Sequence, residues 1–190
     1  ILGMFNASPD NTVIFPFIPG TAEELGKIVT DDYFGKITEE RLKISENLIY
    51  FKGDGKFRSK IGVNSLRASE FIGSYDNKKE ILTLVNYPVK RCKECFVNSL
   101  WQKEQKEPFS GDAVNSYNDG PNDIGTGLGN FYELESSSSA ALLKPNETQT
   151  HYQRTFHFEG NFEELNKLAK ALLKADLSIL KENKIFKTPF

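Results

Sequence analysis

The residues best suited to chemistry in this chain fall between positions 131 and 160. This stretch contains both histidines, His151 and His157, together with two closely spaced glutamates, Glu133 and Glu135. Carboxyl and imidazole groups are the side chains that most often exchange protons with a substrate near neutral pH. The stretch therefore makes general acid–base catalysis the first chemistry to consider, with Glu135, His151 and His157 as candidate catalytic residues.

The alternation of residue types predicts how strands would present these groups. Over residues 131–135, Phe131, Glu133 and Glu135 would share one face of a strand, because successive side chains point to opposite faces. A second strand is predicted over residues 149–158, with His151 and His157 on one face and aromatic side chains on the other. If the two strands belong to one sheet, acids and imidazoles would meet on a common polar face.

Three features follow one another in this stretch: the dipeptide Leu134-Glu135, the turn Leu-Lys-Pro-Asn-Glu at 143–147, and a strand with alternating aromatics. This order resembles the C-terminal end of galactose mutarotase-like (aldose 1-epimerase) proteins. The segments NSYNDGP at 115–121, FYELESSS at 131–138 and RTFHFEG at 154–160 resemble more closely an uncharacterised bacterial branch of that superfamily, seen mostly in Bacteroidetes. The resemblance implies an antiparallel supersandwich, of which only the C-terminal half is present here.

The resemblance also implies roles for individual residues. In that family the glutamate of the Leu-Glu dipeptide removes the proton from the anomeric hydroxyl of a sugar, a role that falls here on Glu135. The family's general acid is a histidine in an upstream His-x-Tyr-Phe-Asn-like segment, whereas residues 1–130 contain no histidine. Under the resemblance only His151 or His157 could supply that proton, although neither occupies the family's position. The chemistry requires no cofactor.

A polar, glycine-rich stretch over residues 112–129 is predicted to be a loop. Its Asn, Asp and Tyr side chains offer the donors and acceptors that sugar hydroxyls require, and long loops on β scaffolds often bind ligands. Simple turn formation is an equally good interpretation. The single tryptophan could stack on a sugar face or be buried in the core. The candidate substrate-binding residues are Asn115, Tyr117, Asn118, Asp119, Glu133 and Trp101.

No metal or cofactor is expected. Asp112, Asp119 and Asp123 could bind calcium, but their spacing does not fit an EF-hand loop. Cys92 and Cys95 form a lone Cys-x-x-Cys motif, for which a local disulfide or a solvent-facing thiol pair is favoured over a redox pair or half of a zinc site.

Composition sets the class of the protein. The chain has 190 residues, of which 38% are hydrophobic and 26% charged, as expected of one globular domain over residues 1–190. Because it opens with Ile-Leu-Gly-Met-Phe, which looks like the middle of a strand, it could also be the C-terminal portion of a longer domain. A net charge of −2 argues against a nucleic-acid or anionic-membrane partner, and no apolar run is long enough to span a bilayer.

The remaining pattern predicts a mainly β fold, an antiparallel β-sandwich with one C-terminal helix. The helix is expected over residues 161–175, with Asn161 as its N-cap. A hairpin is predicted over residues 42–52 with its turn at Glu46-Asn47. Further strands are predicted at 12–18, 58–63, 69–75, 80–86 and 96–101.

Three functions remain open on the sequence. The chain could be a carbohydrate-binding enzyme of the aldose 1-epimerase type, acting on a monosaccharide or an oligosaccharide, or a sugar-binding sandwich without catalysis. It could also be a structural half-domain that pairs with a missing N-terminal half or forms a homo-oligomer. The resemblance alone favours a periplasmic or secreted location, which the residues themselves leave unknown.

Overall fold

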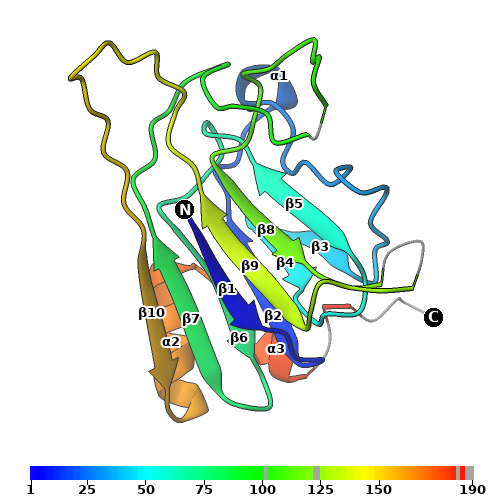
Figure 1. Cartoon of the computed structure of the whole chain (residues 1–190). Coiled ribbons are helices and arrows are strands. Elements are labelled where there is room, and N and C mark those ends of the chain that lie inside the picture. Colours follow the sequence, from blue (N-terminus) through cyan, green and yellow to red (C-terminus); the bar gives the residue numbers. More distant parts are fainter. Residues whose placement is uncertain (101, 122–124, 183–184, 187–190) are drawn as a thin grey trace.

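The computed structural model describes residues 1–100, 102–121, 125–182 and 185–186, and it has a mainly β fold. Two antiparallel sheets pack face to face as a sandwich, which confirms the predicted fold class. Figure 1 shows the smaller sheet in front of the larger one. The strand order is β1-β9-β8-β5 in the four-stranded sheet and β10-β7-β6-β2-β4-β3 in the six-stranded sheet.

Each sheet combines strands that are distant in the sequence. The four-stranded sheet contains β1 (Leu2–Asn6), β9 (Phe131–Ser136), β8 (Val114–Asn118) and β5 (Ser59–Val63). The six-stranded sheet contains β10 (Arg154–Glu159), β7 (Ile81–Asn86), β6 (Phe71–Asp76), β2 (Asn11–Pro16), β4 (Leu48–Lys52) and β3 (Leu42–Ser45). The hairpin predicted over residues 42–52 is confirmed as β3 and β4.

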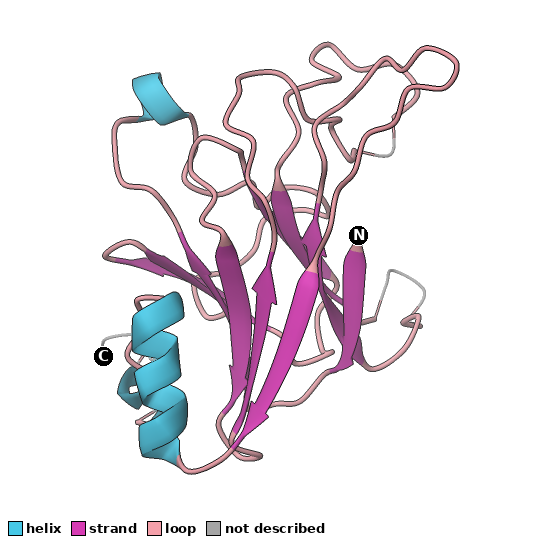
Figure 2. Cartoon of the chain, turned by 90° about the vertical axis from the view of Figure 1, so that its left-hand side faces the viewer, coloured by secondary structure: helices cyan, strands magenta, loops and turns pink. Residues whose placement is uncertain are grey.

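The helices α2 (Phe162–Leu172) and α3 (Ser178–Lys181) form a third layer behind the six-stranded sheet. The single-turn helix α1 (Ala22–Leu25) lies apart from them, among the loops at the top of Figure 1. Figure 2 shows α2 packed on the outside of the strands, on the side away from the N-terminus. One hydrophobic core lies between the two sheets, and a second joins the six-stranded sheet to α2 and α3. Every residue of β2 is therefore buried, because both faces of its sheet are covered.

The C-terminal helix forms as the sequence predicts, and ends slightly earlier. The Asn161 side chain accepts a hydrogen bond from the Glu164 backbone amide at 3.0 Å, which satisfies one of the free amides at the helix start. Leu165 and Ala169, one turn apart, are buried against the sheet. Helical structure ends at Leu172, three residues before the predicted boundary.

Two sequence-based expectations for the strands are wrong. Residues 112–129 are not one loop, because they contain β8, which is paired with β5 on one side and β9 on the other. This strand is polar on both faces and so lacks the apolar alternation by which half-buried strands are identified. Residues 96–100 form no strand, and Phe96 makes an isolated bridge with Ser110.

Cys92 and Cys95 form a disulfide, which is one of the two interpretations that the sequence favoured, the other being a solvent-facing thiol pair. Both side chains pack against the core between the sheets. Among the described residues, no group of three or more His, Cys, Asp or Glu side chains is placed to hold a metal ion. None of the described helices has the length and apolar character needed to cross a membrane.

Candidate functional site

Strand β9 presents its two glutamates on the outer face of the four-stranded sheet. Glu133 and Glu135 alternate with Tyr132 and Leu134, which are 4% and 0% exposed and belong to the core between the sheets. The alternation predicted from the sequence is thus confirmed. Because the six-stranded sheet packs only on the inner face, the outer face is left free for a ligand site.

Antiparallel pairing brings other polar side chains beside these acids. Tyr117 of β8 lies opposite Glu133, and Lys60 of β5 lies opposite Tyr117. Directly opposed side chains in an antiparallel pair are close enough to interact. Three strands therefore place a cation, a phenol and a carboxyl group in one row across the sheet.

This outer face is hollowed into a cavity of about 280 Å³, here called the sheet-face cavity. Its floor comes from β5, β8 and β9, and its rim from the segments around Tyr33, Ser99 and Leu128. The volume is close to the lower limit typical of small-molecule sites. The lining residues are Tyr33, Phe34, Arg58, Lys60, Ser99, Leu100, Tyr117, Leu128, Phe131, Glu133 and Glu135.

Three aromatic rings form one wall of the sheet-face cavity. The ring centroids of Phe34 and Tyr117 lie 5.8 Å apart in an edge-to-face arrangement, and those of Tyr117 and Phe131 also lie 5.8 Å apart. These separations are typical of favourable aromatic pairs. The three rings support one another and offer an apolar surface beside the carboxyl groups.

Glu135 forms an ion pair with Lys60 across the floor of the cavity. The Lys60 Nζ atom lies 3.1 Å from Glu135 Oε1 and 3.2 Å from Oε2, and it donates a hydrogen bond to Oε2. Both side chains are largely buried, at 15% and 19% exposure. Oε1 is buried and accepts no hydrogen bond from the described residues, because the ammonium group is poorly aligned with it. Glu135 thus keeps one buried oxygen without a hydrogen-bond donor among the described residues.

Glu133 differs from Glu135 although it lies on the same face of the same strand. Its side chain takes part in no hydrogen bond or ion pair with any described residue, while its backbone carbonyl accepts a hydrogen bond from the Ser116 hydroxyl. Burial, and then the negative charge of Glu135, raise the pKa of Glu133 above its usual value. The cavity therefore contains one carboxylate that is ion-paired and one carboxyl group that has no ion pair and a raised pKa.

A buried group of side chains holds Tyr33 at the cavity rim. The Tyr33 hydroxyl donates to Asp112 Oδ2 at 2.6 Å and accepts from Asn115 Nδ2 at 3.2 Å. Asp112 also accepts a hydrogen bond from Thr30. Burial raises the pKa of Asp112 to about 6, even though these hydrogen bonds act in the opposite direction. Asn115, a candidate binding residue, thus positions Tyr33 and does not line the cavity.

The titration of Asp112 should make stability depend on pH. The pKa rises from 3.8 to about 6 on folding, so the folded state binds more protons between those values. The free energy of unfolding then decreases as pH rises through this window. Asp112→Asn should reduce the difference in unfolding free energy between about pH 4 and pH 7 by up to roughly 3 kcal/mol. Urea unfolding of the wild-type protein and the variant at both pH values measures this difference in unfolding free energy.

The matched control for this experiment is Asp10→Asn, which removes an exposed carboxyl group. That variant should keep the pH dependence of the wild-type protein. An unchanged pH dependence in Asp112→Asn would contradict the assignment to Asp112.

Asp119 and Asn118 have structural positions beside the cavity. Asp119 accepts hydrogen bonds from the Tyr117 hydroxyl at 2.7 Å and from the Gly129 amide at 2.7 Å, so it fixes both the phenol and the following loop. Asn118 is fully buried and bonds to the backbone of Gly55 and Phe57. Of the candidate binding residues, Tyr117 and Glu133 line the cavity, while Trp101 lies outside the described residues.

The histidines do not join the acids, so the interpretation of a shared polar face is wrong. His151 Nε2 lies 3.0 Å from the hydroxyl of Ser136, a buried residue that points to the opposite face from Glu135. His157 belongs to β10 in the other sheet, where its Nδ1 lies 3.0 Å from the Thr83 hydroxyl. The shared face required both predicted strands to lie in one sheet, but β9 and β10 belong to different sheets. The strand predicted over residues 149–158 also begins only at Arg154, so His151 precedes it.

Sequence reasoning missed seven residues of the sheet-face cavity, which are Tyr33, Phe34, Arg58, Lys60, Ser99, Leu100 and Leu128. A partial signal existed for Lys60, which alternates with the buried Ser59 and Ile61 and so had to lie on the outer face of its strand. Nothing local could place β5 two strands away from β9.

The chain was compared with models of protein families, with curated proteins and with solved structures. No curated protein and no solved structure matches it. The model of a family of unknown function, DUF6786, matches residues 1–184. The chain therefore belongs to this family of unknown function.

Proposed function

We propose that the protein binds a single sugar ring in the sheet-face cavity and interconverts its two anomers. The observation that carries this proposal is the pair Glu133 and Glu135: two carboxyl groups on one strand face, in different electrostatic states, beside an aromatic wall. The resemblance of Leu134-Glu135 and the following turn to mutarotase-like proteins supports the same chemistry.

The cavity suits a sugar because it combines apolar and polar surfaces. The rings of Phe34, Tyr117 and Phe131 can pack on the C–H face of a pyranose, as aromatic side chains do on apolar surfaces. Glu135 lines the cavity, and its carboxylate is an acceptor for the hydrogen bond of a hydroxyl group. The volume of about 280 Å³ favours one ring over an oligosaccharide.

Anomer interconversion needs a base and an acid at the same time. Glu135, the ion-paired carboxylate, takes the proton of the anomeric hydroxyl, while Glu133 donates its proton to the ring oxygen as the C1–O5 bond breaks. Rotation about C1–C2 in the open aldehyde then exposes its other face. On ring closure Glu133 recovers its proton from O5 and Glu135 returns its proton to O1, so both groups end as they began.

This assignment replaces the imidazole acid with Glu133. Residues two apart on a strand lie about 7 Å apart along one face, which allows two carboxyl groups to approach the two oxygens on C1 from either side. A carboxyl group whose pKa is raised by its surroundings, as that of Glu133 is, is suited to act as the acid beside a carboxylate base.

The test is NMR of freshly dissolved α-anomers of a panel of aldoses, with saturation transfer reporting binding and anomer signals reporting exchange. Binding with exchange faster than in buffer alone supports the proposal. Binding without faster exchange would leave a non-catalytic sugar-binding sandwich. No binding across the panel would contradict both.

A structural half-domain is the second candidate. Leu2 and Met4 of the edge strand β1 lie opposite Glu135 and Glu133 in the register and are 53% and 57% exposed. They extend the outer face as an apolar surface that another chain segment or a second copy could cover. Concentration-dependent association in sedimentation experiments would favour this candidate.

A further inference from the structure

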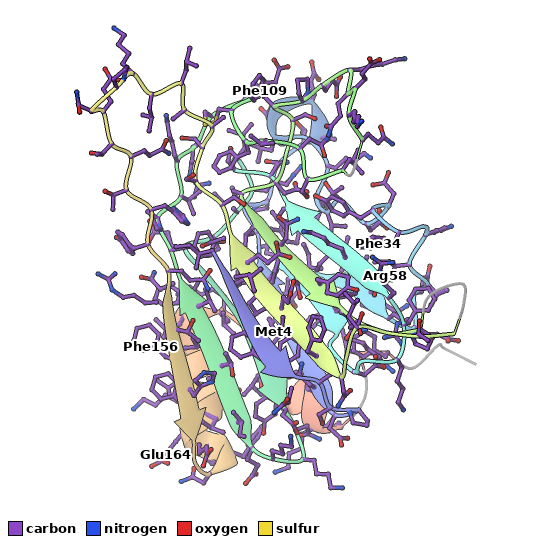
Figure 3. The ribbon with its side chains drawn as sticks, viewed as in Figure 1. Met4, Phe34, Arg58, Phe109, Phe156 and Glu164 are labelled. Carbon is purple, nitrogen blue, oxygen red and sulfur yellow. A yellow bond between two sulfur atoms is a disulfide. The ribbon has the colours of Figure 1, made fainter. Side chains whose placement is uncertain are left out.

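Arg58 is held rigidly at the wall of the sheet-face cavity. Its guanidinium carbon lies 4.4 Å from the centroid of the Phe34 ring, so the cation lies over the aromatic face. Its Nε donates to the Tyr117 hydroxyl at 3.2 Å, and that hydroxyl donates to Asp119. Figure 3 shows Phe34 and Arg58 side by side over the β5 part of the outer face.

These contacts leave the terminal nitrogens of Arg58 available. Among the described residues, neither Nη atom has a hydrogen-bond acceptor, and no carboxylate lies within ion-pair distance of the guanidinium group. Asp119 does not neutralise Arg58 directly, because the Tyr117 hydroxyl lies between them. A half-buried cation with free donors needs an anion or polar acceptors as partners.

The other charges of the cavity do not supply that anion. Lys60 and Glu135 form an ion pair and cancel each other. Glu133, the second acid, forms no ion pair with Arg58, and burial raises the pKa of its carboxyl group. Among the described lining residues, Arg58 is therefore the cation without an ion-pair partner.

We propose that the sheet-face cavity selects sugars that carry a carboxylate, such as hexuronic acids, and that Arg58 binds this carboxylate through its two terminal nitrogens. This inference rests on the proposed function, since it names the substrate class of the same cavity. A guanidinium group whose plane is fixed by stacking presents two parallel N–H donors, which match the two oxygens of a planar carboxylate. One ring with one carboxylate also suits the volume of the cavity.

The test compares matched sugar pairs by calorimetry: galacturonate with galactose, and glucuronate with glucose, with the corresponding 6-phosphates as a third arm. The wild-type protein should bind each uronate roughly ten- to a hundredfold more tightly than its neutral sugar. In Arg58→Gln the ratio of the two affinities should fall to about one. Arg58→Lys keeps the charge but loses the paired N–H donors of the guanidinium group, so it should retain only part of the preference for the uronate.

The matched control is Arg154→Gln. Arg154 also stacks on an aromatic ring, with its guanidinium carbon 4.5 Å from the Tyr152 centroid, but it is exposed on β10 in the other sheet. This variant should keep the wild-type ratio. Because the affinities for the uronate and for the neutral sugar are compared within the same variant, a substitution that weakens the binding of both sugars equally leaves their ratio unchanged.

Each other outcome has a distinct meaning. Equal binding of uronates and neutral sugars overturns the carboxylate preference and leaves the proposed function intact. A uronate preference that survives in Arg58→Gln overturns the role of Arg58, and tighter binding of the 6-phosphates overturns the choice of carboxylate. Failure of every sugar to bind overturns the proposed function together with this inference.

Discussion

Glu135→Gln is expected to slow catalysed anomer exchange by about 10²–10⁴-fold while sugar binding persists. The amide cannot take the proton of the anomeric hydroxyl, although its oxygen can still accept a hydrogen bond. Glu133→Gln should cause a loss of similar size, because a glutamine cannot protonate the ring oxygen. Exchange measured by NMR at saturating sugar separates the loss of rate from any loss of binding.

Two histidine variants provide the control for this prediction. His151→Gln and His157→Gln should exchange anomers at the wild-type rate, because neither imidazole lies at the cavity. A large loss of exchange in either variant, with full exchange in Glu133→Gln, would return the acid role to a histidine. The pH profile gives a further check, since exchange should fall on the alkaline side as Glu133 loses its proton.

A second variant separates catalysis from folding at this site. Removing the charge of Glu135 leaves Lys60, which is 15% exposed, without its anion and so has its own cost in stability. The double variant Glu135→Gln/Lys60→Met removes both charges together. It should fold, as judged by near-UV circular dichroism, and remain inactive.

Arg67→Met is expected to lower the free energy of unfolding by about 3–5 kcal/mol. Arg67 is 1% exposed and donates four hydrogen bonds of 2.9–3.1 Å to backbone carbonyls. The methionine fills similar space but leaves those carbonyls without their donor. The acceptors are Gly26, Ile18, Gly20 and Thr21. Urea unfolding measures the change.

Arg91→Met is the matched control for Arg67. Arg91 also donates to backbone carbonyls, those of Ser65, Leu66 and Ala68, but its side chain is exposed. Water can satisfy these carbonyls when the arginine is removed, so the loss should stay below about 1 kcal/mol. If both substitutions lowered the free energy of unfolding by the same amount, burial would not be the reason for the loss of stability in Arg67→Met.

The sequence by itself determined the local features of this protein. Alternation in β9 fixed which residues face outward, because a strand reverses its side chains at every residue. The cap at Asn161 and the spacing of Leu165 and Ala169 fixed the start and the buried face of α2. These signals depend only on neighbours along the chain, and so does the hairpin of β3 and β4.

Only the tertiary structure decided which of these features meet. The ion pair between Lys60 and Glu135 joins residues 75 positions apart, and it exists because β8 lies between β5 and β9. The sequence did not predict β8, because most of its residues are polar and it lacks the alternation of apolar residues that identifies a strand. Its buried polar side chains are stabilised by hydrogen bonds, such as the one from Ser116 to the Glu133 carbonyl. The same pairing order placed the histidines away from the acids. Strand order depends on long-range packing, which periodicity along the chain does not encode.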